Sequence, residues 1–280
     1  MQFFILVIYF AAFSFIGWVS ESLICSIAEK KVVNRGFLQG PFIPVYGFGG
    51  LIIVYILAPF QENVLALYVV GVVACTLLEY ITAIFCETVF KTKLWDYSQH
   101  RFHFQGRVWV VSSLFFGLLG LFCVYVIYPP FRDLIMSIPN HMVPWISSAF
   151  LAYFAADTCF STVTILRMNG RLGQIAETIS EIRSKLPEFK ITTPAISQRM
   201  DEFRQKYPDL KTISERLQSQ LKISWNQRRL INAFPTMRSK RYNEQLDRVR
   251  EAIEDLRRQR KVRQPEKKNK AHEKNSMSKD

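Results

Sequence analysis

The fold is decided by residues 34–50, which read NRGFLQGPFIPVYGFGG and join two long apolar runs. Five glycines and two prolines interrupt this stretch, so it is not expected to form a plain helix. A broken backbone leaves N–H and C=O groups that lipid cannot satisfy. We therefore expect the stretch to be buried in protein or to line a wet cavity, as broken helices do at transport and ligand sites.

Charge divides the chain into two unlike parts. Residues 1–166 hold eight Lys or Arg and eight Asp or Glu, so the net charge of +13 falls entirely in 167–280. A neutral, apolar first part joined to a basic second part is typical of a membrane domain with a soluble tail. We predict a transmembrane domain over 1–166, a basic helical or coiled-coil region over 167–261, and a disordered basic tail over 262–280.

The first part contains five apolar segments, near 3–24, 43–60, 64–88, 107–128 and 142–166. Each approaches or exceeds the ~20 residues that cross a hydrocarbon core of ~30 Å. Buried helices of a soluble protein are the alternative, which so many long apolar runs disfavour. The predicted fold class is an all-α membrane protein of about five transmembrane helices followed by a cytoplasmic helical tail. The second helix is expected to be broken or re-entrant, because Pro44 and several glycines crowd its start.

Loop charge predicts how these helices are oriented. Basic residues concentrate in the loops between segments 1 and 2 and between segments 3 and 4, and basic loops stay in the cytoplasm. The N-terminus is therefore expected outside and the tail inside the cell. The first segment has no basic region before it and no small-residue cleavage site after it, so a cleaved signal peptide is not expected.

Disulfides and metal binding are not expected either. The five cysteines lie within apolar segments and form no CxxC pair. His100 and His103 lie three residues apart with Asp96 nearby, but histidines in interfacial loops are far commoner than metal ligands. Asp96 is instead expected to cap a turn through the backbone N–H of Ser98.

Four carboxyl side chains lie inside the apolar segments or at their ends, where ionisable groups are costly and face a bundle interior. They are Glu21, Glu79, Glu87 and Asp157, and all four are expected in the cytoplasmic half of the membrane. A buried carboxylate needs a cation or a proton. Arg35 and Arg107 lie in the adjoining loops, and Glu21 or Glu79 is predicted to pair with one of them. A structural network that locks helix packing is the alternative to a functional site.

The other two carboxyls have plainer candidate partners. Lys91 lies four residues after Glu87, which is the spacing of an ordinary ion pair on a helix. The candidate partners of Asp157 on its own helix are Thr158, Ser161 and Thr162. Partners of this kind would make both carboxyls structural.

Three motifs support one resemblance. They are Asn34-Arg35-Gly36-Phe37-Leu38 with Gly40-Pro41 and Pro44-x-Tyr46-Gly47; Leu78-Glu79-Tyr80; and Trp95-Asp96-Tyr97-Ser98 followed by Gly106-Arg107. Two further runs fit as well, Gly17-Trp18-Val19-Ser20 before Glu21 and Asn232-Ala233-Phe234-Pro235 in the tail. Over about residues 1–130 the chain closely resembles the bacterial ABC-transporter type IV (CmpB-like) permease family.

The resemblance implies a permease subunit in a bacterial cell membrane, with no cofactor. The sequence contains no GxxxxGK[ST] phosphate loop, so ATP hydrolysis would need a separate ATPase subunit docked on the cytoplasmic face. Five helices are few for a complete pore, so a homo- or hetero-oligomer is expected in the lipid bilayer. The candidate substrate site or polar cluster comprises Glu21, Asn34, Arg35, Gly36, Gly40, Pro41, Tyr46, Gly47, Glu79, Tyr80, Trp95, Asp96, Tyr97 and Arg107.

Apolar residues recur at helical spacing in the tail and predict three helices. The sets are Leu172, Ile175, Ile179, Ile182 and Leu186; Leu210, Ile213, Leu217 and Leu221; and Leu246, Val249, Ile253 and Leu256. The first set has the spacing of a short coiled coil. A self-associating helical bundle and a polybasic surface on anionic lipid are the two main interpretations. Nucleic-acid binding is disfavoured, because no reader motif accompanies the charge.

Two functions therefore compete. The first is a transport permease subunit. The second is a non-transporting membrane anchor or scaffold whose basic helical tail binds a partner or anionic lipid. A membrane enzyme is disfavoured and the chain is predicted not to be one, because no GxSxG, HExxH or paired-histidine pattern is present.

Overall fold

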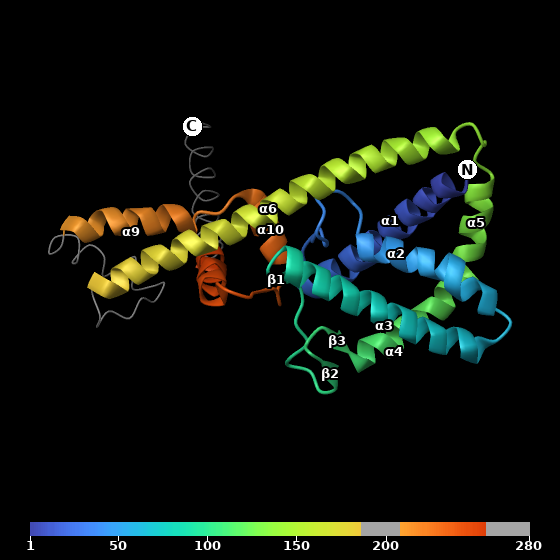
Figure 1. Ribbon diagram of the computed structural model, residues 1–280, viewed down its shortest axis with the longest axis horizontal. Coiled ribbons are helices and arrows are strands. Elements are labelled where there is room, and N and C mark those ends of the chain that lie inside the picture. Colours follow the sequence, from blue (N-terminus) through green and yellow to red (C-terminus); the bar gives the residue numbers. More distant parts are fainter. Residues whose placement is uncertain (186–207, 256–280) are drawn as a thin grey trace, which may run out of the picture. The chain divides into compact units, whose positions relative to one another are not determined.

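A computed structural model describes residues 1–185 and 208–255 of the chain (Figure 1). Contacts within the chain divide it into two compact units. The first comprises residues 1–167 together with 229–240, and the second comprises 168–228 and the residues from 241 onward. The sequence predicted a boundary near residue 166. It did not predict that residues 229–240 belong to the first unit.

The first unit is built almost entirely of helices. They are α1 (Gln2–Glu29), α2 (Pro44–Ile52), α3 (Val64–Val89), α4 (Val110–Phe122), α5 (Tyr128–Met136) and the first part of α6 (Val143–Lys185). A π-helical turn (Ile53–Leu57) and a 3-10 turn (Ala58–Phe60) extend α2. Another π-helical turn (Cys123–Ile127) joins α4 to α5.

Four of these helical stretches are long and apolar enough to cross a membrane: Gln2–Glu29, Val64–Val89, Val110–Met136 and Val143–Ser184. The apolar stretch Pro44–Phe60 is shorter and reaches about 25 Å at 1.5 Å per residue. The predicted all-α membrane fold is therefore confirmed, and the protein is a multi-pass membrane protein. The second helix is irregular over 53–60, but the expected break at its start is wrong, because Pro44 and the glycines after it lie within the regular helix α2.

Proline chemistry explains where the helices become irregular. Pro44 begins α2, since its fixed φ suits a first helical turn and its missing N–H is not needed there. Pro59 lies inside the 3-10 turn and cannot donate to the preceding turn, and a π-helical turn comes directly before it. The same order of π-helical turn and then prolines recurs where α4 meets α5.

Glycines let α1 and α2 approach closely. A Cβ at Gly17 would lie 2.2 Å from the ring of Tyr46, and one at Gly50 would lie 2.2 Å from the ring of Phe13. Residues 46 and 50 of α2 thus face residues 17 and 13 of α1, so the two helices are antiparallel. Figure 1 shows α1, α2, α3 and α4 next to one another.

Further contacts fix the relative directions of the other helices. The Tyr125 hydroxyl donates to the Gln61 carbonyl (2.6 Å), so α4 runs antiparallel to α3. The Ser147 hydroxyl donates to the Phe4 carbonyl (2.8 Å), and Gly40, after α1, contacts Asp157 further along α6. Since α2 packs antiparallel to both α1 and α3, helices α1, α3 and α6 share one direction and α2 and α4 the other.

One buried apolar cluster packs helices of the first unit against each other. The buried cluster there comprises Tyr9, Phe13, Ile53, Leu57, Leu67, Cys123, Val124 and Ile135. On the outside of the same helices, large apolar side chains such as Leu65, Phe115 and Trp145 remain exposed. An exposed apolar surface of this extent on a helical unit is what contact with lipid requires.

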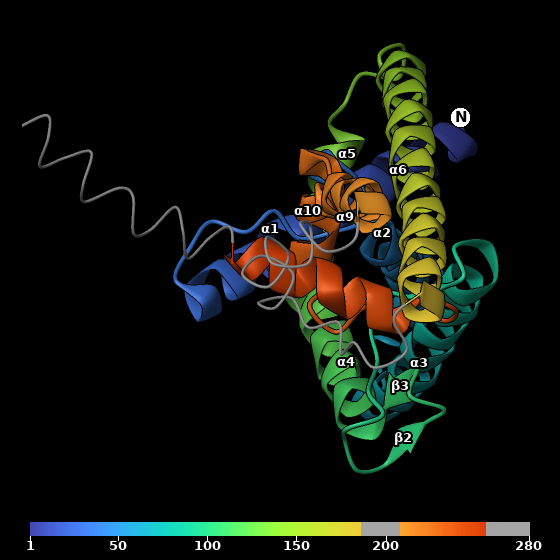
Figure 2. The same ribbon diagram turned by 90° about the vertical axis from the view of Figure 1, so that its left-hand side faces the viewer.

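The segment between α3 and α4 forms a small hairpin rather than the start of a helix (Figure 2). β2 (His103–Phe104) pairs antiparallel with β3 (Val108–Trp109). Its turn holds Gln105 and Gly106 at φ 54° and 69°, as a type I′ turn requires. The predicted apolar segment 107–128 therefore starts as helix only at Val110, and it continues to Met136.

The second unit contains the tail helices. α6 continues without interruption to Lys185, so its predicted membrane and tail portions are one helix. α9 (Pro208–Leu221), α10 (Trp225–Ala233) and a helix over 243–255 follow. The three predicted tail helices are therefore observed, although Leu186 and Leu256 lie outside the described residues. The coiled-coil assignment stays a prediction.

Candidate functional site

The loop after α1 is held by side chains of its own motif. The Trp18 indole N–H donates to Asn34 Oδ1 (2.7 Å), and Asn34 Nδ2 donates to the Gln39 carbonyl (3.2 Å). Gly36 has φ 118°, a conformation that L side chains rarely adopt. Gly36 and Leu38 are buried. The expectation that this broken stretch is buried in protein is confirmed for these residues.

Arg35 and Glu21 form the ion pair that the sequence predicts. Arg35 Nε donates to Glu21 Oε1 at 3.0 Å, and the Arg35 backbone N–H donates to the Ser22 hydroxyl. The Arg35 guanidinium also lies 5.2 Å from the ring centre of Phe234, a cation–π distance. Arg35 therefore joins α1, the broken loop and the returning segment 229–240.

Asp157 of α6 binds the backbone of the same loop. Its two carboxylate oxygens accept from the N–H groups of Gln39 (2.9 Å) and Gly40 (2.8 Å). The Tyr153 and Ser161 hydroxyls complete the set at 3.3 Å each. Ser161 was among the predicted partners, but the two backbone donors were not foreseen. Gly40 is needed here, because a Cβ would lie 1.6 Å from the Tyr153 hydroxyl.

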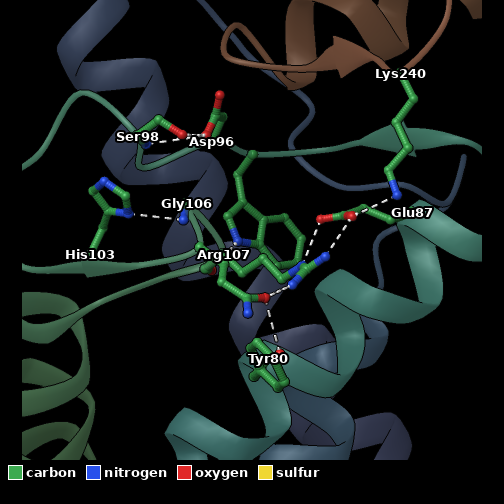
Figure 3. A network of polar contacts seen from close by, with 10 residues as sticks. Tyr80, Glu87, Asp96, Ser98, His103, Gly106, Arg107 and Lys240 are labelled. Carbon is green, nitrogen blue, oxygen red and sulfur yellow. Dashed lines mark hydrogen bonds and ion pairs between the residues drawn. The ribbon is translucent and has the colours of Figure 1, made fainter.

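Glu87, at the end of α3, collects two cations (Figure 3). Arg107 forms a bidentate pair with it, with Nε–Oε1 at 2.8 Å and Nη2–Oε2 at 2.9 Å. Lys240 Nζ lies 2.8 Å from Glu87 Oε2. The hydrogen bond to Glu87 raises the pKa of Arg107 above its ordinary value.

The pair Glu21–Arg35 satisfies the prediction, whereas Arg107 has a partner that the sequence did not suggest and the candidate pair Glu87–Lys91 does not form. Arg107 pairs with Glu87 and not with Glu21 or Glu79, because the hairpin starts beside the end of α3. Glu87 does not use Lys91, because α3 ends at Val89 and Lys91 has left-handed φ 50°. Glu87 and Lys91 therefore do not lie one turn apart on a common helix.

The loop Trp95-Asp96-Tyr97-Ser98 is fastened to the hairpin. Asp96 Oδ1 accepts from the Ser98 backbone N–H (3.1 Å), which confirms the predicted cap. The Trp95 indole N–H donates to the Arg107 carbonyl, and the Tyr97 N–H donates to the Gly106 carbonyl. Burial raises the pKa of Asp96, but hydrogen bonds from Ser98 and nearby cations outweigh it and leave the pKa below its ordinary value.

The histidines of this loop have structural contacts. His103 Nδ1 accepts from the Gly106 backbone N–H (2.9 Å), and His100 stacks on Trp109 with ring centres 4.5 Å apart. Within residues 1–185 and 208–255, no three His, Cys, Asp or Glu side chains are grouped so that they could hold a metal ion.

Glu79 lies deeper on α3 and differs from the other carboxyls. It is buried, at 8 % exposure, and Tyr97 hydrogen-bonds to it. Its Oε2 has no hydrogen-bond partner among the described residues. Burial, and then the adjacent Glu79 carboxylate, raise the pKa of the Tyr97 phenol above its ordinary value. Tyr46 of α2 lies close enough to Tyr97 and Glu21 to interact with them electrostatically.

The segment 229–240 returns from the tail to these loops. The buried Arg229 donates through Nη1 to the Gly36 carbonyl (3.0 Å) and through Nη2 to the Phe37 carbonyl (2.9 Å). Burial lowers the pKa of Arg229 below its ordinary value, and the charge of Asp157 counteracts part of this shift. These carbonyls belong to the broken stretch, so an arginine nearly two hundred residues away satisfies part of its backbone.

The same segment reaches the Glu87 site. β4 (Arg238–Ser239) pairs antiparallel with β1 (Thr92–Lys93). Arg238 Nε lies 3.0 Å from Asp96 Oδ2, and Lys240 contributes the second cation at Glu87. Sequence reasoning did not assign a role to Arg229, Arg238 or Lys240. The signal within reach was the motif Asn232-Ala233-Phe234-Pro235, which lies between them.

The predicted site residues fall into two groups in space. One group surrounds the broken loop and Glu79, and comprises Glu21, Asn34, Arg35, Gly36, Gly40, Tyr46, Glu79 and Tyr97. The other surrounds Glu87, and comprises Tyr80, Trp95, Asp96 and Arg107. Gly47 packs on α1, where a Cβ would lie 2.2 Å from the Ser14 hydroxyl. Pro41 is half-buried in the loop.

Comparison with known proteins agrees with this arrangement. The family described as "Putative ABC-transporter type IV" matches residues 8–162, which include most of α1, all of α2 to α4, the broken loop and Asp157. No curated protein and no solved structure matches the chain. The family match covers more than half of the sequence and all but the returning segment of the site. The chain belongs to the ABC-transporter type IV family.

Proposed function

We propose that the chain is the membrane-spanning permease subunit of a transporter that is driven by a separate ATP-binding subunit. The observation that carries this proposal is the broken loop 34–43, whose backbone is bound by Asp157 and Arg229 inside a bundle of apolar helices. Broken backbone surrounded by ionisable groups within a helical bundle is the usual construction of a transport site.

The proposal places the protein in the bacterial cell membrane. The alternating directions of α1, α2, α3, α4 and α6 are consistent with five crossings, which would put the N-terminus outside and the tail in the cytoplasm. The basic residues of loops 30–35 and 91–107 then lie on the cytoplasmic side, as the positive-inside rule requires. An ATP-binding subunit would dock there, next to the Glu87 group.

The test is co-purification from native membranes. The tagged full-length chain is expected to bring down a protein with an ATP-binding cassette, together with ATPase activity that inhibitors of such cassettes abolish. Arg35→Gln should leave the complex assembled and reduce this activity about tenfold, the effect of ~1.4 kcal/mol. Arg132→Gln is the matched control, because Arg132 forms an exposed pair with Asp133 away from the loop. An ATPase-free preparation with the chain intact contradicts the proposal.

A second function is favoured by the returning segment. Residues 229–240 connect the tail helices to the broken loop. An anchor or scaffold whose tail binds a partner or anionic lipid would use such a connection. In that case neutralising Glu79 and Arg107 in a folded protein leaves the biological function intact. Removing residues 167–280 abolishes it. A permease gives the opposite result for the first change.

The chain is proposed not to be an enzyme, and to act in the lipid bilayer as part of a homo- or hetero-oligomer. The apolar surface of α1 to α4 supports the bilayer as its surroundings. The oligomer is supported by the small number of spanning helices. Cross-linking of the purified protein in lipid nanodiscs measures the number of copies directly.

A further inference from the structure

Three of the four carboxyls that lie inside the apolar segments or at their ends have their charge compensated. Glu21 pairs with Arg35, Glu87 pairs with Arg107 and Lys240, and Asp157 accepts four hydrogen bonds. Glu79 is the exception: no lysine or arginine of the described chain pairs with it. A charged carboxylate in such a place is costly, and the cost is avoided if the group carries a proton.

The surroundings of Glu79 are polar but uncharged. Tyr97, from the loop before the hairpin, hydrogen-bonds to the carboxyl, and Ser112 of α4 hydrogen-bonds to Tyr97 in turn. Cys75, one turn earlier on α3, faces the carboxyl as well. Thr76 lies on the same face of the helix, and its buried hydroxyl has no partner among the described residues.

Charged groups lie close to Tyr97 and Tyr46. Glu21 of α1 and Tyr46 of α2 act on the Tyr97 phenol, and Arg35 acts on Tyr46 while paired to Glu21. A row of polar side chains therefore leads from the half-exposed pair Glu21–Arg35 to the buried carboxyl of Glu79. Metal cations need several oxygen ligands, whereas the single unpartnered Oε2 of Glu79 can bind one proton.

We infer that Glu79 is a proton-binding site, and that Tyr97 passes the proton between the carboxyl and the polar loop around Arg35. Uptake forms one O–H bond on Glu79 and breaks no other bond in the protein. In the relay, Tyr97 gives its hydroxyl proton to the carboxylate and takes one from a hydronium ion on the loop side, which becomes water. The inference does not depend on transport, since a buried protonated carboxyl exists with or without a transported substrate.

Infrared spectroscopy of the full-length protein in nanodiscs tests the inference. A protonated carboxylic acid has a C=O stretching band that a carboxylate lacks. We expect this band at neutral pH, its loss in Glu79→Gln, and its retention in the matched variant Glu21→Gln, whose carboxylate is paired. Tyr97→Phe should shift the band, because it removes the hydrogen bond. A spectrum without the band, or a band that survives Glu79→Gln, overturns the inference.

A second measurement uses only the wild-type chain, in case Glu79→Gln does not fold. Apolar carbodiimides react with protonated carboxyls inside membranes, and mass spectrometry locates the modified residue. Labelling of Glu79 is expected at neutral pH, to decline as the pH rises, and to exceed labelling of Glu87 at least about tenfold, the effect of one pH unit of separation. Equal labelling of both carboxyls contradicts a proton site. Protection of Glu79 by sodium ions at constant pH would identify a cation site instead.

Discussion

Glu79 and Glu87 are buried carboxyls of α3, about two helical turns apart, yet their surroundings are opposite. Glu87 is 3 % exposed and holds Arg107 in a bidentate pair with Lys240 beside it. Glu79 is 8 % exposed, and its polar neighbours among the described residues include the Tyr97 hydroxyl and the Cys75 thiol. The fully paired carboxyl fastens three segments of the chain together. The unpaired one contributes no such link, which is why a chemical role is assigned to Glu79 and a structural role to Glu87.

The largest effect is expected from replacing the two carboxyls one at a time. Glu87→Gln leaves Arg107 and Lys240 without their counter-charge and should destabilise the protein by about 3 kcal/mol. Glu79→Gln replaces a neutral acid by a neutral amide of the same shape and should change the unfolding free energy by less than about 1 kcal/mol. Thermal unfolding of the two variants in the same detergent compares them. Equal losses would remove the distinction between the two carboxyls.

Arg229 is expected to matter next. Arg229→Ala withdraws both hydrogen bonds from the Gly36 and Phe37 carbonyls and should cost about 2 kcal/mol. Hydrogen exchange of the backbone amides in 35–40 should then accelerate. Arg228→Ala, one residue earlier on α10, is the matched control and should leave exchange in that loop unchanged. The same acceleration in both variants would show that the helix and not the guanidinium protects the loop.

Gly106 tests whether the hairpin positions Arg107. Gly106→Ala places a Cβ 2.5 Å from the Ser98 hydroxyl at φ 69°, and should cost about 1–2 kcal/mol. Gly170→Ala is its control within α6, since a Cβ there meets nothing within 4 Å and should stabilise the helix by about 0.5–1 kcal/mol. Opposite shifts in the thermal midpoint are therefore expected. A loss in both would point to a general intolerance of the detergent-solubilised protein.

The smallest effect concerns pH. The pKa of Asp96 is lower in the folded protein than its ordinary value of ~3.9, so its contribution to stability is complete above that value. The contribution declines as the pH falls through the folded pKa. Asp96→Asn should lower stability slightly at neutral pH and remove this part of the acid dependence. Unfolding measured from neutral pH down to about pH 3 would show parallel curves if Asp96 makes no such contribution.

Much of the fold follows from local patterns in the sequence. The apolar runs predicted the spanning helices, but the glycines of 47–50 lie in a regular helix and the irregular turns come after them, next to Pro59. The pair Glu21–Arg35 was also predictable, since the loop returns directly to the helix that carries Glu21. Each of these features depends on residues close together in the chain.

The parts that escaped prediction depend on distant residues or on helix ends. Lys91 and Glu87 have helical spacing, but the helix stops between them. Arg107 was one candidate partner of Glu21 or Glu79, but the hairpin brings it to Glu87. Nothing in the local pattern around Arg229 says which carbonyls it binds, because the loop at 36 and 37 presents only backbone to it.

The close contact of α1 with α2 has a consequence for biosynthesis. Gly17, Gly47 and Gly50 lie within 34 residues of one another, so both faces of the contact leave the ribosome before α3 does. α2 is short and interrupted, and its glycines find their partners on a helix that is already present. Helices α1 and α2 can therefore enter the membrane as one helical hairpin, with the broken loop 34–43 at its tip. The later helices then assemble around a loop whose conformation α1 has already begun to fix.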